Sequence, residues 1–317
     1  MLNHRWLLIP IFPYDRIISA GSGDGVTWRR DPGIRVEVGG ASGAIQVYSP
    51  HVVPVANGFR MYYRSGSRNS LIASALSTDE LQWQEEPGAR VAPEDRGLQR
   101  AEGPYCLPPA AGAWRLYYSG FAAAGWSIFA EESVDGLSWG GAIACSTLAG
   151  GRPEWHVKDP CVLRETAGYR IWYRATDGGL LSEIWTAISS DGYTWRELRQ
   201  CGGLAPADRR LGFPSVIRLD DGRLRMFYDE YSSSTIVGMQ LSTALSEDGI
   251  EWRAEGACIS PGGRFDRRGA FGAKVLRLDG GQWTLVYDSG QDALYLRELV
   301  TYDGTLYAFG VQDGQGK

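Results

Sequence analysis

Two acidic residues stand just before prolines in segments that otherwise have the apolar character of buried strands. Glu102 begins the tripeptide Glu-Gly-Pro, and Asp159 directly precedes Pro160. Cleavage of a glycosidic bond needs two such carboxyl groups, one to protonate the leaving oxygen and one to act as base or nucleophile. Burial among aromatic side chains would raise the pKa of Glu102 and keep it protonated, as a general acid requires. The alternative is that Asp159 caps a turn and Glu102 is a solvated loop residue.

Histidine is a second candidate for acid/base chemistry. The chain has three histidines, and His51 follows Pro50 in a segment that resembles those of Glu102 and Asp159. An imidazole can transfer protons, bind a metal or donate a hydrogen bond to a substrate. No histidine pair has the spacing of a zinc site, so we expect no metal and no cofactor. An axial ion or water held by His51 is one alternative, and a packed, hydrogen-bonded histidine is another.

These residues belong to a repeat that runs along the whole chain. The turn pattern Ser/Thr-x-Asp-Gly-x-x-aromatic recurs with a spacing of about 56 residues, near the range of propeller blades. Its copies end at Trp28, Trp83, Trp139, Trp195, Trp252 and Tyr307, and the copy that ends at Trp195 is Ser190-Asp191-Gly192. Asp-Gly between apolar residues indicates a tight hairpin, because Gly tolerates a positive φ. Between the turns, a Pro-containing segment is followed by an aromatic strand, so each unit has four expected strands.

The repeat predicts an all-β fold: a five-bladed β-propeller of four-stranded antiparallel blades with almost no helix. One domain should span residues 1–317, and the fifth unit should end with the turn at Thr301. An extra outer hairpin at about residues 15–31, around Asp24, would either pair with the last blade or cover the seam of the ring. In such a ring the Pro-containing segments are the innermost strands.

Side chains on these inner strands and at the ends of the aromatic strands should border the ring axis. The expected lining residues are Ser49, Arg64, Tyr105, Trp155, Arg174, Asp229, Lys274 and Asp288. Two arginines and several acids around one axis would form a charged pocket, and Trp155, which lies outside the repeat, could stack on a sugar. A lysine near the axis is costly unless it is paired, so Lys274 indicates an anionic partner from the protein or a ligand. Alternatively, Arg64, Arg174, Asp229 and Asp288 each begin an ordinary polar loop, and Tyr105 and Trp155 pack between blades.

Composition and charge limit the binding partners and the cellular location that can be expected. The chain has 317 residues, 12 Trp and a net charge of -5, and it shows no basic footprint for nucleic acid. No segment is long enough to span a membrane, and the start is too short and too interrupted by proline for a signal sequence. The five cysteines have irregular spacing, which argues against a disulfide framework. A cytoplasmic location and a small-molecule or carbohydrate ligand are therefore expected.

The chain resembles the superfamily of five-bladed propeller glycosidases (arabinanases and β-xylosidases, invertases and levansucrases, and mannoside phosphorylases) over nearly its whole length. Glu102-Gly103-Pro104 and Asp159-Pro160 match short motifs of that superfamily. The resemblance implies that Glu102 is a general acid and Asp159 a supporting carboxylate at the axis. The chain departs from the family at Ser49, where the family has its base or nucleophile Asp, so Asp229 or Asp288 would have to supply that carboxylate.

Three functions follow from these expectations. The first is a glycosidase-like enzyme that acts on a glycoside or sugar conjugate in the axial pocket. The second is the same fold working as a lyase, cyclase or isomerase on a small metabolite, which the loss of the first Asp and the presence of His51 favour. The third is a non-catalytic sugar-binding propeller, against which the pair of Glu102 and Asp159 argues.

Overall fold

The computed structural model describes most of the chain from residue 16 onward, and strands dominate it. The described residues are 16–316 except 41–43, 45, 67–68, 111, 149–153, 179–180, 205–208, 233–237, 279, 291–294, 303–304 and 313–314. Within these residues the only helix is one 3₁₀ turn, η1 (Pro93–Arg96). The expectation of almost no helix is confirmed for this part of the chain.

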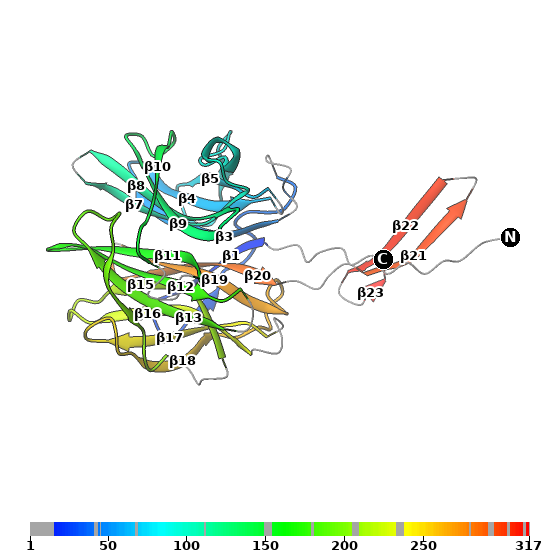
Figure 1. The fold of residues 1–317 in the computed structure, drawn as a ribbon. Coiled ribbons are helices and arrows are strands. Elements are labelled where there is room, and N and C mark those ends of the chain that lie inside the picture. The colour runs from blue at the N-terminus through cyan, green and yellow to red at the C-terminus, as the bar shows by residue number, and fades with distance from the viewer. Residues whose placement is uncertain are drawn as a thin grey trace.

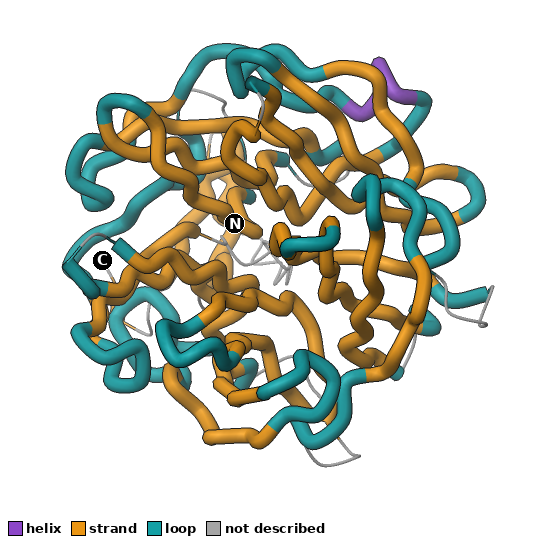
Figure 2. The backbone as a smooth tube through the Cα atoms, turned by 90° about the vertical axis from the view of Figure 1, so that its left-hand side faces the viewer, coloured by secondary structure: helices purple, strands orange, loops and turns teal. Residues whose placement is uncertain are grey.

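Five four-stranded antiparallel sheets surround a central axis (Figures 1 and 2). Blade one comprises β3 (Val47–Val55), β4 (Gly58–Ser65), β5 (Leu71–Ser77) and β6 (Gln84–Glu85), and blade two comprises β7 (Arg100–Ala110), β8 (Ala113–Ala122), β9 (Gly125–Ser133) and β10 (Gly140–Ala144). Blade three comprises β11 (His156–Glu165), β12 (Gly168–Thr176), β13 (Ser182–Ser189) and β14 (Arg196–Gln200), and blade four comprises β15 (Arg209–Arg218), β16 (Leu224–Ser232), β17 (Gln240–Ser246) and β18 (Arg253–Ile259). The inner strands β3, β7, β11, β15 and β19 contact one another in turn and close the ring. The five-bladed propeller is thus confirmed.

Blade five combines the N-terminal hairpin of the described chain with two strands that come after blade four. It contains β19 (Gly269–Arg277), β20 (Trp283–Gly290), β1 (Arg16–Ser22) and β2 (Arg29–Arg30). Strand β1 runs antiparallel to β20 over its whole length, from Arg16 opposite Ser289 to Ser22 opposite Trp283. Of the two roles considered for the N-terminal hairpin, the structure therefore shows pairing with the last blade.

The expectation that the turn at Thr301 completes the fifth blade is wrong. Strands β21 (Tyr295–Tyr302), β22 (Thr305–Gln312) and β23 (Gln315–Gly316) hydrogen-bond in a three-stranded sheet of their own. The outer position of blade five is filled instead by β1 and β2, whose turn at Gly25 receives a hydrogen bond of 3.1 Å from Arg225 of blade four. That the whole chain forms a single domain stays a prediction.

The repeated Asp-Gly turn is a small hydrogen-bonded unit. In blade two, Asp135 Oδ1 accepts bonds from the N–H groups of Leu137 and Ser138 (both 2.8 Å), and Ser133 Oγ accepts one from Gly136 N (2.9 Å). The same arrangement is built by Ser22 with Asp24, Ser77 with Asp79, Ser189 with Asp191, and Ser246 with Asp248. Ser189, not the neighbouring Ser190 of the sequence pattern, accepts the bonds in blade three.

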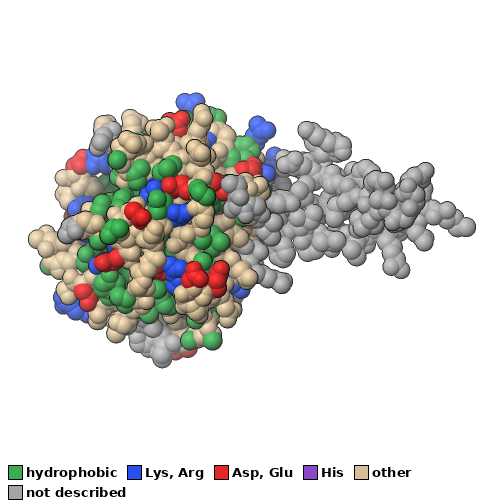
Figure 3. Space-filling model, turned by 90° about the horizontal axis from the view of Figure 1, so that it is seen from above, with side chains coloured by type: hydrophobic (Ala, Val, Ile, Leu, Met, Phe, Trp, Pro, Cys, Tyr) green, Lys and Arg blue, Asp and Glu red, His purple; other side chains and the backbone are tan. Residues whose placement is uncertain are grey.

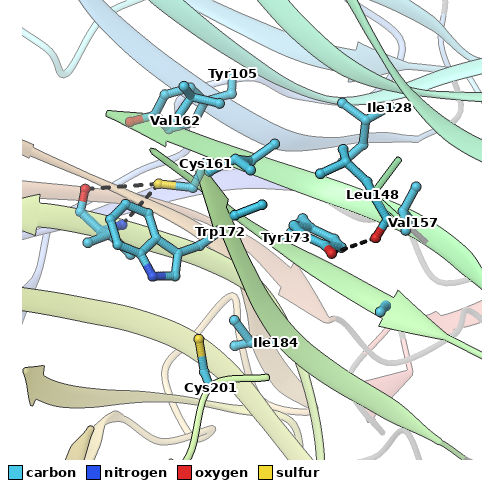
Figure 4. Close-up of a cluster of buried hydrophobic side chains, with 14 of the residues drawn as sticks. Tyr105, Ile128, Leu148, Val157, Cys161, Val162, Trp172, Tyr173, Ile184 and Cys201 are labelled. Atoms are coloured by element: carbon cyan, nitrogen blue, oxygen red, sulfur yellow. Dashed lines mark hydrogen bonds between the residues drawn. The ribbon is translucent and has the colours of Figure 1, made fainter. Parts of the chain in front are cut away.

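Three of these turns also tie neighbouring blades together. Buried side chains on the second strand of one blade donate to the turn carbonyl of the next: Tyr62 to Gly136 (2.6 Å), Tyr117 to Gly192 (3.1 Å) and Trp172 to Gly249 (2.9 Å). The largest core cluster lies between blades two, three and four, and Figure 4 shows part of it around Cys161, Trp172 and Tyr173. The repeated aromatics and turns therefore hold the ring together.

The cysteines serve this packing. All five are free thiols, and four of them are buried. Cys161 Sγ accepts the N–H of Val216 from the next blade at 3.1 Å (Figure 4). Burial raises the pKa of the Cys161 thiol, so this side chain stays protonated and packs as a small apolar group.

Candidate functional site at the ring axis

Every innermost strand has a β-bulge at the same height on the axis. The register with the second strand shifts there in all five blades. One residue of each bulge has a left-handed φ, namely Ser49 (54°), Gly103 (57°), Asp159 (55°), Phe213 (48°) and Gly272 (66°). Non-glycine residues adopt this conformation at a cost of about 1–3 kcal/mol, and such positions cluster at functional sites.

The positions of the bulges show how the strands of the two candidate acids align with each other. Gly103, not Glu102, is the counterpart of Asp159, because it has the left-handed φ. Glu102 lies one position earlier, where blade three has Lys158 and blade one has Tyr48. Glu102 and Asp159 therefore do not occupy equivalent positions in their blades, although both belong to short motifs before a proline. The two acids nevertheless lie in one charged cluster. A Cβ atom at Gly103, the neighbour of Glu102, would lie 3.3 Å from Asp159 Oδ1, and the charges of both acids act on Lys158 and on Arg174.

Asp229 and Asp288 hold two of these bulges in place. Both carboxylate oxygens of Asp288 accept the N–H of Ser49 at 2.9 Å, and both oxygens of Asp229 accept the N–H of Gly272 at 3.0 Å. Neither side chain is exposed. Burial raises the pKa of Asp229 well above its usual range, although the N–H of Gly272 opposes this. Asp288 thus lies beside Ser49, as expected of a replacement carboxylate, but its oxygens are engaged by the backbone.

Glu102 is surrounded by cations. Its Oε2 lies 3.1 Å from Lys158 Nζ, and its Oε1 lies 3.3 Å from both Arg64 Nε and Ser70 Oγ. Burial favours the neutral acid, but the charges of Lys158 and Arg64 outweigh it, so the pKa of Glu102 lies below its ordinary value. The expected rise of this pKa is therefore wrong, because cations and not aromatics form the immediate surroundings. Glu102 is a carboxylate at neutral pH.

Asp159 forms the second ion pair at the axis. Its Oδ2 lies 2.7 Å from Arg174 Nε, and its backbone N–H donates to Ser119 Oγ at 2.9 Å. The guanidinium of Arg174 stacks over the ring of Phe213, 5.0 Å from its centroid. Asp159 is thus held by Arg174 of its own blade and by Ser119 of blade two.

Aromatic rings border these ion pairs. Lys158 Nζ lies 3.6 Å from the ring centroid of Trp126, and the guanidinium of Arg64 lies 3.7 Å from that of Tyr48. We call the set of Glu102, Asp159, Lys158, Arg64, Arg174 and Trp126 the axial mouth. Its long side chains are mostly buried, with 13% of Lys158, 14% of Arg174 and 9% of Glu102 exposed.

Sequence reasoning missed Lys158. Its position in the repeat could have identified it. Lys158 directly precedes Asp159, just as Glu102 directly precedes Gly103, and Asp159 and Gly103 are equivalent residues. Trp155, expected to face a ligand, instead packs in the largest core cluster. The charged groups are bordered instead by Tyr48 and by Trp126, and the backbone N–H of Trp126 donates to His156 Nδ1 at 3.3 Å.

His51, Tyr105 and Lys274 form a second level, two residues farther along the inner strands. His51 Nδ1 accepts the N–H of Cys106 at 3.0 Å, and its ring lies 4.1 Å from that of Tyr105. Burial, helped by the charge of Lys274, lowers the pKa of His51 to about 3. Lys274 donates to the carbonyl of Pro214 at 2.6 Å. This level is buried, so His51 is neutral and engaged by the backbone.

Among the described residues, no three or more His, Cys, Asp or Glu side chains gather as metal ligands would. In the same part of the chain, no helix has the length and apolar character needed to cross a membrane.

Comparison with known proteins gives structural matches only. No family model and no curated protein sequence matches the chain. It is similar to a thermostable family-43 glycoside hydrolase (14% identity, 86% of this chain and 95% of that chain, TM-score 0.62) and to an endo-arabinase from Bacteroides thetaiotaomicron (16%, 84% and 95%, TM-score 0.58). It is also similar to a β-1,2-mannobiose phosphorylase from Listeria innocua in complex with β-1,2-mannobiose (13%, 77% and 89%, TM-score 0.57). The chain thus has the five-bladed fold of these carbohydrate-active enzymes, and the expected resemblance is confirmed at the level of the fold.

Proposed function

We propose that the chain is a carbohydrate-active enzyme that binds a glycoside or sugar conjugate at the axial mouth and uses Glu102 for proton transfer. The observation that carries this proposal is the convergence of Glu102 and Asp159 from neighbouring blades at the axis. The fold shared with glycoside hydrolases supports it, as does the β-1,2-mannobiose in the Listeria innocua structure. Tyr48 and Trp126 offer aromatic rings beside the acids for a sugar.

In a glycosidase-like reaction, Glu102 protonates the leaving oxygen of the sugar. It can do so only after gaining a proton, because Lys158 and Arg64 keep it ionised in the free protein. A substrate that moves Lys158 away from Glu102 would remove part of this stabilisation and raise the pKa. Asp159, held by Arg174, then orients the substrate.

A second candidate function follows from the ionised state of Glu102. A carboxylate beside an ammonium group is suited to removing a proton, which is the first step of a lyase or isomerase. In this reaction Glu102 takes the proton, and the charge of Lys158 stabilises the negative charge that develops on the substrate. The observation that favours this reaction over the first is the lowered pKa of Glu102.

Product analysis in D₂O distinguishes the two reactions. A panel of aryl glycosides and sugar conjugates is incubated with the protein and with Glu102→Gln, and the products are followed by NMR. Glycosidic cleavage yields a free reducing sugar without deuterium on carbon, whereas proton removal introduces deuterium on carbon or an alkene signal. Glu132→Gln is the matched control, because Glu132 lies in the same blade but pairs with Arg115, away from the axial mouth. Equal turnover by Glu102→Gln and the control would refute the role of Glu102.

A further inference from the structure

We propose that a groove on blade one is a second ligand site, which binds a neutral saccharide against Trp83. The groove and the axial mouth lie at opposite ends of β4. Asn57 lines the groove directly before this strand begins, whereas Arg64, near the end of the strand, belongs to the axial mouth. The strand separates the two sites by roughly 20 Å, at about 3.3 Å per residue. The inference therefore goes beyond the proposed function and does not depend on the chemistry at the axis.

Trp83 differs from the other tryptophans of the repeated turn in its surroundings. Each of the other four packs edge-to-face against a ring on the second strand of the preceding blade, with ring centroids between 5.6 and 6.4 Å apart. These pairs are Trp28 with Phe227, Trp139 with Tyr62, Trp195 with Tyr117, and Trp252 with Trp172. The ring pair is thus a regular feature of the joints between blades.

The joint between blades five and one cannot form this ring pair, because Val286 stands at the position of the ring. Val286 is opposite Ser19 on the third strand of its sheet, just as Tyr62 is opposite Ser74 in blade one. Valine has neither a ring for Trp83 nor a donor for the turn. The indole of Trp83 donates instead from its Nε1 to the carbonyl of Glu80 in its own turn, at 2.9 Å.

The groove beside Trp83 has the size and the lining of a sugar site. Its volume is about 680 Å³, and ligand sites typically have about 300–1,000 Å³. The half-buried Trp83 and Leu76, which is 38% exposed, provide its apolar part. An indole presents a flat apolar face, and amides both donate and accept hydrogen bonds, so the C–H face and the hydroxyls of a sugar find partners. The polar lining consists of Asn57, Ser77, Thr78, Gln82 and Gln84.

The charge of the groove indicates a neutral ligand. Among the described residues that line it, only Arg60 is charged, and its guanidinium is paired with Glu86 through bonds of 2.9 and 3.1 Å. On the face shown in Figure 3, basic and acidic side chains are spread among the others, so a nearly uncharged groove differs from that surface. A charged ligand would lose its hydration in the groove without gaining a countercharge.

The equivalent groove of blade four shows that the repeat alone does not produce these properties. It is smaller, with a volume of about 380 Å³, and its Trp252 is only 5% exposed and packs against Trp172. Charged side chains line it where blade one has neutral ones, namely Glu247 for Thr78, Glu251 for Gln82 and Arg253 for Gln84. The wide and neutral groove is therefore particular to blade one in this comparison.

Indole NMR signals locate the binding. In a proton–nitrogen correlation spectrum, the Nε1–H signals of Trp83 and Trp126 report on the groove and on the axial mouth, and Trp83→Phe and Trp126→Phe assign them. Xylotetraose, cellotetraose and mannotetraose are titrated into Glu102→Gln, so that turnover does not interfere. At least one of them should shift the Trp83 signal with a Kd of about 1 mM or tighter. A Trp83 signal that none of the three shifts would overturn the inference.

Salt and an acidic saccharide test the class of the ligand. Added NaCl should leave the affinity of the neutral tetrasaccharide within about twofold, because salt screens only charged groups. Tetragalacturonate should bind more weakly at the Trp83 signal than the neutral tetrasaccharide. Tighter binding of tetragalacturonate would show that the groove does not select a neutral ligand.

Variants connect the binding to the lining of the groove. Trp83→Leu should weaken it about tenfold or more, because leucine stays apolar but lacks the flat ring. Asn57→Ala combined with Gln82→Ala should weaken it about threefold or more through lost hydrogen bonds. Both of these residues are exposed, so the pair still decides the question if Trp83→Leu does not fold. Glu251→Ala is the matched control, since Glu251 has the position of Gln82 in blade four, and thermal unfolding is measured for each variant.

The outcomes separate this inference from the proposed function. Binding at the Trp83 signal without turnover of any sugar conjugate supports the groove and contradicts the enzyme. Turnover that Glu102→Gln abolishes, together with an unshifted Trp83 signal, supports the enzyme and overturns the groove. Binding that Trp83→Leu and the exposed pair leave within about twofold would also overturn it, because lost contacts should cost more.

Discussion

Lys158 Nζ lies 3.1 Å from Glu102 Oε2, and the two residues occupy equivalent positions in neighbouring blades. The contact exists because each inner strand bulges at the following residue, which brings the positions before the bulges toward the axis. The repeat thus brings an acidic and a basic side chain together, although the two residues are far apart in the sequence. The protonation of Glu102 depends on this pair.

Replacing Glu102 by Gln should lower turnover of the true substrate by about 10²–10⁴, the typical effect of losing a proton-transferring group. The amide keeps the shape of the side chain and its contact with Lys158. The substrate affinity should change much less than kcat. Steady-state kinetics beside Glu132→Gln provide the measurement, and an unchanged kcat would assign the proton transfer to another group.

Replacing Lys158 by Met should move the limb of the pH–rate profile that Glu102 controls to higher pH; this is the alkaline limb if Glu102 donates a proton and the acidic limb if it removes one. Lys158 stabilises the ionised form of Glu102, so its removal raises the pKa of Glu102. Arg64, Arg100, Arg174 and Asp159 still face the site, so the limb should shift rather than disappear. Lys158→Arg should leave it near its original position. A limb that stays in place in Lys158→Met would show that Glu102 is not the titrating group.

Closure of the ring by strand β1 can be tested with one core residue. Ile17 has no exposed surface and pairs with Asp288 on β20. Ile17→Ala should lower the free energy of unfolding by about 2–5 kcal/mol, as such truncations do in a packed core. Val26→Ala, in the exposed turn of the same hairpin, should change it by about 0.5 kcal/mol or less. Denaturant unfolding gives both values, and a small loss at Ile17 would mean that β1 is not essential to blade five.

The repeated turn offers a matched pair of adjacent serines. Ser189 Oγ accepts the N–H of Gly192 at 2.8 Å, whereas Ser190 is exposed. Ser189→Ala should therefore lower the free energy of unfolding by about 1 kcal/mol, the usual net value of a buried hydrogen bond. Ser190→Ala should have almost no effect. Equal changes in the two midpoints of thermal unfolding would contradict the hydrogen-bonding scheme of the turn.

The fold was predictable because the pattern that encodes it is local and repeated. Each Asp-Gly turn satisfies its own N–H groups, so the turn can be recognised without knowing its neighbours. The candidate site was harder to predict than the fold, because its chemistry depends on contacts between blades. In the sequence, Glu102 is an acidic residue in an apolar segment. No residue adjacent to it in the sequence indicates that Lys158 forms an ion pair with it. Trp155 lies outside the repeat and was therefore expected to be available to a ligand, but the fold places it in the core.

Hydrolysis of neutral arabinan, xylan or sucrose should be slow, about 10²-fold or more below that of an enzyme with both carboxylates. Ser49 cannot activate water, and the buried oxygens of Asp288 are held 2.9 Å from the N–H of Ser49. Ser49→Asp combined with Asp288→Asn would restore a carboxylate at the bulge, because Asp tolerates the left-handed φ there, as Asp159 shows at 55°. We expect this double variant to gain activity on aryl glycosides, measured by release of the aryl group. Rapid release by the unmodified protein would show instead that Asp229, Asp288 or Asp159 supplies the second carboxylate.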